Sequence, residues 1–236
     1  MSANNVLLKA EDMVRDYMSR FDSSHDFLHV DRVRRSALHI AKKHGGDPEV
    51  VELAALFHDV ADAKYAKNHV HYRTGSEIVI DFLKDLNYDA TKAQLIGRIV
   101  DNIGFRKELG WSSKDDAEFI TWRESCLELH AVQDADKLDA IGAFGVLRCA
   151  AFSGARNISL FNPDDAPIEG MTKEQYEQQT DNGGGSSINH FHASTEKLFL
   201  LKNMMRTPTG KELAEKRDQF MRQFVHQIQE EYLMNA

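Results

Sequence analysis

Residues 50–61 read VVELAALFHDVA, an almost unbroken apolar run that ends in a histidine and an aspartate side by side. A segment that is apolar on nearly every face is typical of a fully buried helix. Asp47 is suited to cap this helix, and Pro48 fits its first turn. His58 and Asp59 are therefore predicted to lie inside a buried helix, where an uncompensated carboxylate costs several kcal/mol.

Further helices are predicted wherever apolar residues recur at steps of three and four, and no segment alternates convincingly with period two. They cover residues 26–44, 74–86, 91–103, 121–152, 189–205 and 210–232. Gly142 and Gly145 mark places where another helix or the chain itself comes close. We expect an all-α chain, with residues 1–236 forming a single domain of about eight helices.

The helical spacing of apolar residues stops in residues 154–189, which contain Pro163, Pro167 and the run DNGGGSS. Such a composition is typical of a loop-like insertion at the surface. Two interpretations follow, a linker without a role of its own or a lid over the functional site.

The composition excludes several classes of protein. A chain of 236 residues that is 42% hydrophobic and 28% charged is globular, and its net charge of −8 argues against binding a nucleic acid polymer. Cys126 and Cys149 are too few for a disulfide framework, which favours a reducing compartment. Without a long apolar run or a signal-peptide block, we expect no membrane partner and a cytoplasmic location, with the nucleus as the alternative.

A divalent metal ion would compensate the buried histidine and aspartate, because imidazole nitrogen and carboxylate oxygen are both metal ligands. His29 lies on the inward face of the 26–44 helix, and Asp134, Asp136 and Asp139 lie on the 121–152 helix. Periodicity does not choose between Asp134 and Asp136, since their helix is apolar on nearly every side. For any histidine taken alone, a hydrogen-bonded core residue is the competing interpretation.

The order His29, His58-Asp59 and a later aspartate resembles the H…HD…D signature of the HD-domain superfamily of metal-dependent phosphohydrolases. The last aspartate of that family lies in a segment similar to ADKL, which implies Asp136 as the fourth ligand and Asp134 as its substitute. The resemblance extends through SHDFLHVDRV, LAALFHDVADAK, VQDADKLDAIGAFGVLR and, in the tail, INHF, EKLFLL, MMRTPTG and KRDQFM. This branch includes bacterial enzymes similar to nucleoside triphosphate pyrophosphohydrolases, which implies a small phosphorylated substrate, most often a nucleotide.

Two imidazoles and two carboxylates around one ion favour Mn²⁺, with Mg²⁺, Fe²⁺, Co²⁺ and Zn²⁺ as alternatives. Such an ion lowers the pKa of a bound water molecule and polarises a phosphoryl oxygen. His71 resembles the first additional histidine of relatives that hold two metals, but no histidine occurs from residue 72 to 129. We therefore expect one metal ion.

Asp62 follows Asp59 by three residues, so a continuing helix would place both on roughly the same face. Related HD nucleotidases carry an acidic residue at this offset, which implies that Asp62 orients or deprotonates the attacking water. An exposed aspartate near a helix end is the alternative.

Cations are needed to bind phosphate groups, and Lys64, Arg148 and Lys197 are the candidates, with Arg217 as a further one. Each could equally be a surface cation that covers apolar atoms with its stem. His25, four residues before His29, is expected to contact substrate or orient a ligand.

The sequence is also compatible with two other functions. The first is a phosphomonoesterase of the 5′-nucleotidase type. The second is a non-catalytic interaction protein in which the ion only holds helices together. The sequence does not set the oligomeric state.

Overall fold

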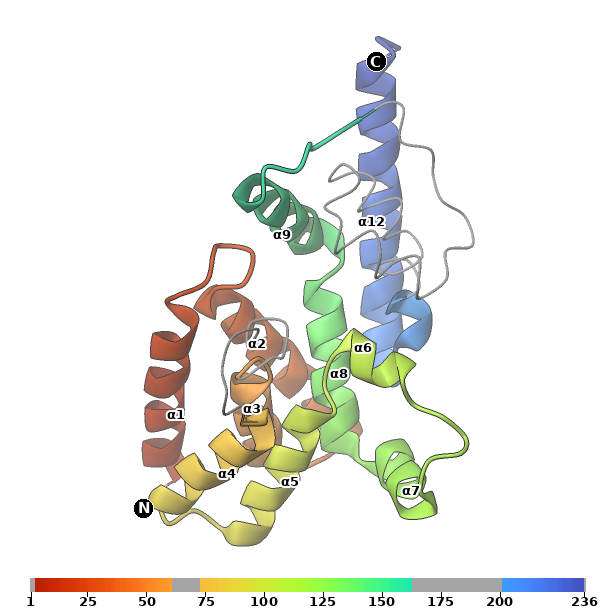
Figure 1. Cartoon of the computed structure of the whole chain (residues 1–236). Helices are drawn as coiled ribbons and strands as arrows, with labels where there is room; N and C mark the ends of the chain where they lie inside the picture. Colours follow the sequence, from red (N-terminus) through yellow and green to blue (C-terminus); the bar gives the residue numbers. More distant parts are fainter. Residues whose placement is uncertain (1–2, 61–72, 163–200, 236) are drawn as a thin grey trace. The chain divides into compact units, whose positions relative to one another are not determined.

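The computed structural model describes residues 3–60, 73–162 and 201–235. All regular secondary structure in these ranges is helical, which confirms the all-α prediction. The elements, labelled in Figure 1, are α1 (Ala3–Met18), α2 (Phe27–His44), α3 (Pro48–Phe57), α4 (Gly75–Asp85), α5 (Ala90–Asp101), α6 (Phe105–Leu109), α7 (Ala117–Ser125), α8 (Leu127–Asp139), α9 (Gly142–Ala155), the 3₁₀ helix η2 (Lys202–Met204) and α12 (Pro208–Tyr232).

Side-chain caps begin the helices that the sequence places most accurately. Asp26 accepts a hydrogen bond from the third residue of α2, and Asp47 accepts two from the first turn of α3. Thr74 and Glu77 form a reciprocal capping box at the start of α4. These caps satisfy backbone N–H groups that have no partner within the helix, which explains why their sequence signals are reliable.

The predicted single helix over residues 121–152 is wrong, because this stretch belongs to three helices. Cys126 has an extended backbone conformation between α7 and α8, and Ile141 has one between α8 and α9. Gly142 follows with a φ of +77°, in the left-handed region that favours glycine. An apolar stretch without proline reads as one helix, but tertiary packing divides it.

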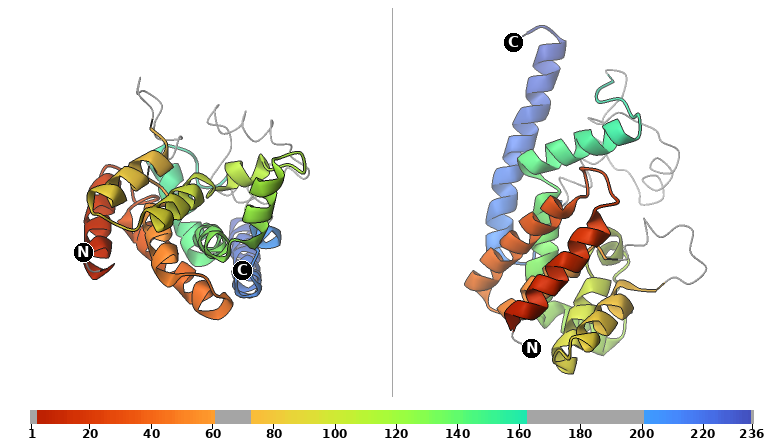
Figure 2. Two further views of the ribbon diagram at one scale, coloured as in Figure 1. Left: turned by 90° about the horizontal axis from the view of Figure 1, so that it is seen from below. Right: turned by 90° about the vertical axis from the view of Figure 1, so that its left-hand side faces the viewer.

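The chain forms two compact units, residues 1–20 with 26–137 and residues 21–25 with 138–236. In the first unit, α3 packs against α1, α2 and α5, and α5 packs against α4 (Figure 2). Leu53, Leu56 and Phe57 of α3 are fully buried. The predicted buried helix is therefore a central helix of this unit, and its C-terminal end lies in the interior.

In the second unit, α12 packs against α9 and η2. A β-carbon at Gly142 would lie 2.8 Å from Cγ of Arg217 on α12, and one at Gly145 would collide with the backbone of Ala140. The prediction that another helix or the chain itself approaches these two glycines is confirmed. Asp218, buried on α12, binds Lys202 of η2 with an N–O distance of 2.9 Å.

The predicted insertion at 154–189 lies outside the described residues from residue 163 onward, as does most of the predicted helix at 189–205. Among the helices that are described, none is by itself long and apolar enough to cross a membrane, and the bent pair α8 and α9 meets that criterion only by length and composition.

Candidate metal centre

His58 and Asp59 lie just beyond the C-terminal end of α3. The helix ends at Phe57 and His58 is its C-cap, so the prediction that the helix continues to residue 61 is not met at this point. The N–H of Val60 donates to the carbonyl of Phe57 at 3.0 Å, which closes a turn around the pair. Both residues are buried, with exposed fractions of 6% for His58 and 8% for Asp59.

A backbone hydrogen bond sets the orientation of the His58 ring. Nδ1 lies 2.8 Å from the carbonyl oxygen of Ala55, which belongs to the last turn of α3 and has no donor within the helix. Because a carbonyl only accepts, Nδ1 carries a proton and donates it. Nε2 is thereby the atom left to bind a cation, and the negative end of the α3 dipole points at the same place.

Four side chains from three helical segments converge at this point. His29 of α2 has its Nε2 atom 3.2 Å from Nε2 of His58, and Oδ2 of Asp59 lies 3.1 Å from each of these nitrogens. Oδ1 of Asp136, on α8, lies 3.9 Å from the His29 nitrogen and 3.8 Å from the His58 nitrogen. The two histidines and Asp136 each offer one ligand atom, all within 4.8 Å of one another.

The distances between the two histidine nitrogens, and from these nitrogens to each carboxylate, fit the ligands of a divalent ion. Metal–ligand bonds of about 2.1 Å place neighbouring ligand atoms of an octahedron about 3.0 Å apart, and wider pairs further. The imidazole nitrogens and Asp59 match the shorter separation, and Asp136 has a longer one. The mixed nitrogen and oxygen set matches the preferences of Mn²⁺, Fe²⁺, Co²⁺ and Zn²⁺ better than those of Ca²⁺.

Charge explains why these groups demand a cation. Burial alone lowers the pKa of His58, but the charge and hydrogen bond of Asp59 outweigh it, Asp136 adds to the effect, and the pKa rises to about 9. In the absence of metal, His58 therefore takes up a proton at neutral pH. The group of two histidines and two aspartates thus contains a positive charge both without metal, as a proton, and with metal, as the ion itself.

The geometry distinguishes the two aspartates that periodicity leaves open. Asp136 reaches both histidines and keeps a quarter of its side chain exposed. Asp134 is fully buried and does not belong to the ligand group of His29, His58 and Asp136. Asp134 and Asp136 are two positions apart, which corresponds to a rotation of about 200° around the helix axis. Their side chains therefore leave α8 on different faces. This arrangement supports Asp136 as the fourth ligand.

Two of the predicted substrate contacts come together in the second unit. His25, in the turn before α2, and Arg148, on α9, have their Nδ1 and Nη2 atoms 3.2 Å apart. Arg217 instead donates to the carbonyl of Leu138 at the end of α8. The remaining predicted residues, Asp62, Lys64, His71 and Lys197, lie outside the described residues.

Sequence reasoning missed an ion pair beside Asp136. Lys137 is buried, and its Nζ lies 2.9 Å from both carboxylate oxygens of Glu108 on α6. A lysine in an apolar helix signals that a buried carboxylate must be present. Its partner, 29 residues earlier in the chain, could not be identified from one sequence.

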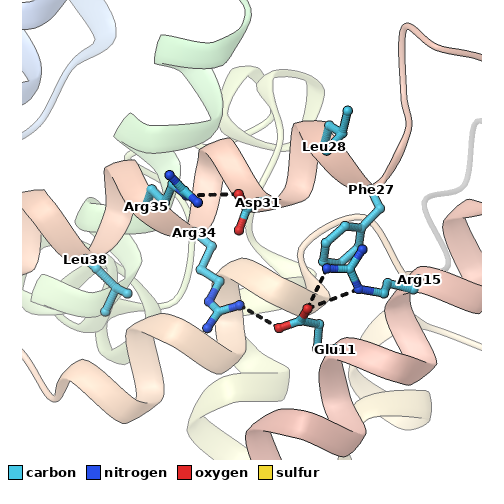
Figure 3. Close-up of a pocket in the computed structure, with 8 residues that line it drawn as sticks. All are labelled: Glu11, Arg15, Phe27, Leu28, Asp31, Arg34, Arg35 and Leu38. Atoms are coloured by element: carbon cyan, nitrogen blue, oxygen red, sulfur yellow. Dashed lines mark hydrogen bonds and ion pairs between the residues drawn. The ribbon is translucent and has the colours of Figure 1, made fainter.

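A groove of about 420 Å³ lies between α1 and α2 and holds none of the predicted site residues (Figure 3). Its three guanidiniums already have carboxylate partners. Arg15 and Arg34 share Glu11, Arg34 also pairs with Glu52, and Arg35 pairs with Asp31, so three carboxylates offset the three guanidiniums. With its charges compensated internally, the groove offers no excess positive charge to a phosphate.

Comparison with known proteins identifies the family of this chain. The HD domain family model matches residues 27–141, a range that contains His29, His58, Asp59 and Asp136. The chain belongs to the HD superfamily of hydrolases.

Three similar proteins extend the likeness over nearly the whole HD-domain chain. YpgQ of Bacillus subtilis is 32% identical over 228 residues, which cover 95% of this chain and 94% of YpgQ. The crystal structure of YpgQ in complex with ADP matches with a TM-score of 0.66 and 30% identity, covering 94% of this chain and 97% of that one. A crystal structure from Lactobacillus plantarum has a TM-score of 0.74 and 32% identity, covering 99% of this chain and 100% of its own. An HD-superfamily hydrolase of Bacillus thuringiensis has a TM-score of 0.70 and 28% identity, covering 98% of each chain.

Proposed function

We propose that the protein is a metal-dependent phosphohydrolase that cleaves nucleoside triphosphates into a nucleoside monophosphate and pyrophosphate. The convergence of two imidazole nitrogens and two carboxylates at the end of a buried helix carries this proposal. The ADP complex of YpgQ supports a nucleotide as the ligand, because a similar chain binds one.

In this proposal His29, His58, Asp59 and Asp136 hold one divalent ion, with Mn²⁺ the best match to the donor set. When bound, the ion supplies an acidified water molecule and polarises a phosphoryl oxygen. The hydrogen bond from His58 Nδ1 to Ala55 keeps the imidazole oriented for this purpose.

The chain supplies a base and cations for the phosphates. Asp62 orients or deprotonates the attacking water, and Arg148, Lys64 and Lys197 offset the charge of the triphosphate, with His25 as a further contact. These roles are proposals, based on sequence position and, for His25 and Arg148, on their mutual hydrogen bond.

The test is a substrate panel with metal-stripped protein to which Mn²⁺, Mg²⁺ or Co²⁺ is added. Pyrophosphate released together with a nucleoside monophosphate supports the proposal. Orthophosphate released from monophosphates would replace it with a nucleotidase. If no substrate turns over while metal raises the melting temperature, the ion has only a structural role.

Two pairs of variants assign the roles. We expect Asp136→Asn to weaken Mn²⁺ binding at least tenfold, about the loss of one charge-assisted ligand contact, and Asp134→Asn to leave it unchanged. Asp62→Ala should keep the metal and lose turnover, whereas His58→Ala should lose both. Parental activity in Asp62→Ala would remove Asp62 from the mechanism.

A further inference from the structure

The guanidinium of Arg148 is held by three hydrogen bonds within the second unit. Nε donates to the carbonyl of Ser24 at 2.8 Å, Nη1 to Oδ2 of Asp139 at 3.1 Å, and Nη2 to Nδ1 of His25 at 3.2 Å. The acceptors come from the turn before α2 and from the last residue of α8, and all three are buried or nearly so. A planar fork of donors with partners on three sides has its plane and direction fixed.

The hydrogen bond between Arg148 and His25 determines the protonation of the imidazole. A guanidinium has donors and no acceptor, so Nδ1 of His25 must accept and carries no proton. The ring is then neutral, and its single proton lies on Nε2. Arg148 thus makes His25 a hydrogen-bond donor at its other nitrogen.

Arg148 keeps part of its donor capacity for a ligand. The three hydrogen bonds use three of its five N–H groups, counted over the part of the chain that the structure describes. Asp139 is 4% exposed and also attracts the half-buried guanidinium of Arg217, so one carboxylate serves two cations. Among the described residues, the cluster of Asp139, Arg148 and Arg217 therefore has one negative and two positive charges, and this excess positive charge suits an oxyanion.

We propose that Asp139 is a positioning residue, which holds Arg148 so that two of its N–H groups bind a phosphate oxyanion, while Arg148 keeps His25 neutral with its proton on Nε2. The identity of the oxyanion as a nucleotide phosphate rests on the proposed function. Asp139, a candidate metal ligand by sequence, acts through Arg148.

The tautomer is tested without reference to activity. Long-range ¹H–¹⁵N correlation spectra of the 236-residue chain at pH 7 should show His25 with a protonated Nε2 and an unprotonated Nδ1. The His25 signals are identified by their loss in His25→Gln. Arg148→Met should release this preference. An imidazolium or an Nδ1-protonated ring in the parent protein would overturn the proposal.

The positioning role is tested by binding of inorganic pyrophosphate, followed calorimetrically, and by the kinetics of triphosphate hydrolysis. Asp139→Ala should weaken pyrophosphate binding and raise KM about tenfold, the loss expected when one charge-assisted hydrogen bond is removed, with a smaller effect on kcat. Asp139→Asn retains an acceptor and should recover most of the affinity. Mn²⁺ affinity should be unchanged in both variants.

Asp218→Ala is the matched control, because Asp218 is an equally buried aspartate of the same unit that binds Lys202 and Arg222. It should lower the melting temperature without changing pyrophosphate affinity. If Asp139→Ala behaves in the same way, Asp139 is only structural and the proposal fails. If the parent protein hydrolyses no triphosphate but binds pyrophosphate through Arg148 and Asp139, the proposed function fails and this inference stands.

Discussion

Metal binding should displace a proton from His58. In the metal-free protein the neighbouring carboxylates outweigh the effect of burial and raise the pKa of His58 to about 9, so the ring is charged at neutral pH. An imidazolium has no lone pair to offer at Nε2. We therefore expect each Mn²⁺ that binds at pH 7 to release one proton from this ring.

The magnitude follows from the difference between the ordinary pKa of 6.5 and the raised value of about 9. At about 1.4 kcal/mol per unit, the charged form of His58 contributes about 3 kcal/mol to the stability of the metal-free protein. Because the folded-state pKa is the higher one, this contribution is complete below pH 6.5 and is lost as the pH rises through 9. Mn²⁺ affinity should instead increase as the pH rises toward 9, by about tenfold per pH unit, because the competing proton leaves His58.

Two measurements test this linkage. Calorimetric titration with Mn²⁺ at pH 7, in buffers of different ionisation enthalpy, gives the number of protons released from the slope of the apparent heat. Melting of metal-stripped protein between pH 6 and 9 gives the stability, with Asp59→Asn as the control that removes the charge responsible. The reasoning is refuted if Mn²⁺ binds without proton release, or if the parent and Asp59→Asn show the same pH dependence.

Three further predictions concern the scaffold. Replacing Lys137 with Met should leave Glu108 buried without its partner and destabilise the protein by about 3–5 kcal/mol, and Glu108→Gln in the same chain should recover part of this loss in urea unfolding. Gly142→Ala should cost about 1–3 kcal/mol, because its φ is positive and α12 lies against it. Gly154→Ala should cost nothing, because the described residues outside its own helix place no atom within 4 Å of the new β-carbon; equal melting temperatures of the two variants would contradict this. Burial raises the pKa of Cys126 to about 11, so iodoacetamide at pH 8 should alkylate it about 100-fold more slowly than an ordinary thiol, as mass spectrometry of the modified peptide would show.

Helix boundaries were predictable where a local signal fixes them. Asp26, Asp47 and Thr74 each satisfy backbone donors within their own first turn, so their effect depends on a few neighbouring residues. The break at Cys126 has no such signal, since this residue does not disfavour a helix strongly, and at Ile141 the signal is only the following glycine, Gly142. Where such a stretch divides depends on how the separate helices pack, which needs the whole fold.

For the candidate site, the residue types were predictable from the sequence, but the pairings between residues were not. The residue types follow from the cost of burying a histidine and an aspartate together. The preference for Asp136 over Asp134 comes from the family resemblance, and a physical reason for it needs the direction in which α8 faces the histidines. The links from Asp139 to Arg148 and from Lys137 to Glu108 join residues of different helices, 9 and 29 positions apart in the sequence. No periodicity records such pairings, and only the structure supplies them.

The place where α3 ends explains why this pair can act as a cation site at all. If the helix continued through His58, the carbonyl of Ala55 would bond to the next turn, and the imidazole would lose the acceptor that orients it. Ending at Phe57 frees that carbonyl and directs the negative end of the helix toward Asp59. Carboxylates and a helix terminus of the same sign cannot remain together in an apolar interior without a positive charge. A proton on His58 meets this demand in the free protein, so a metal ion binds by replacing a charge that the fold already requires.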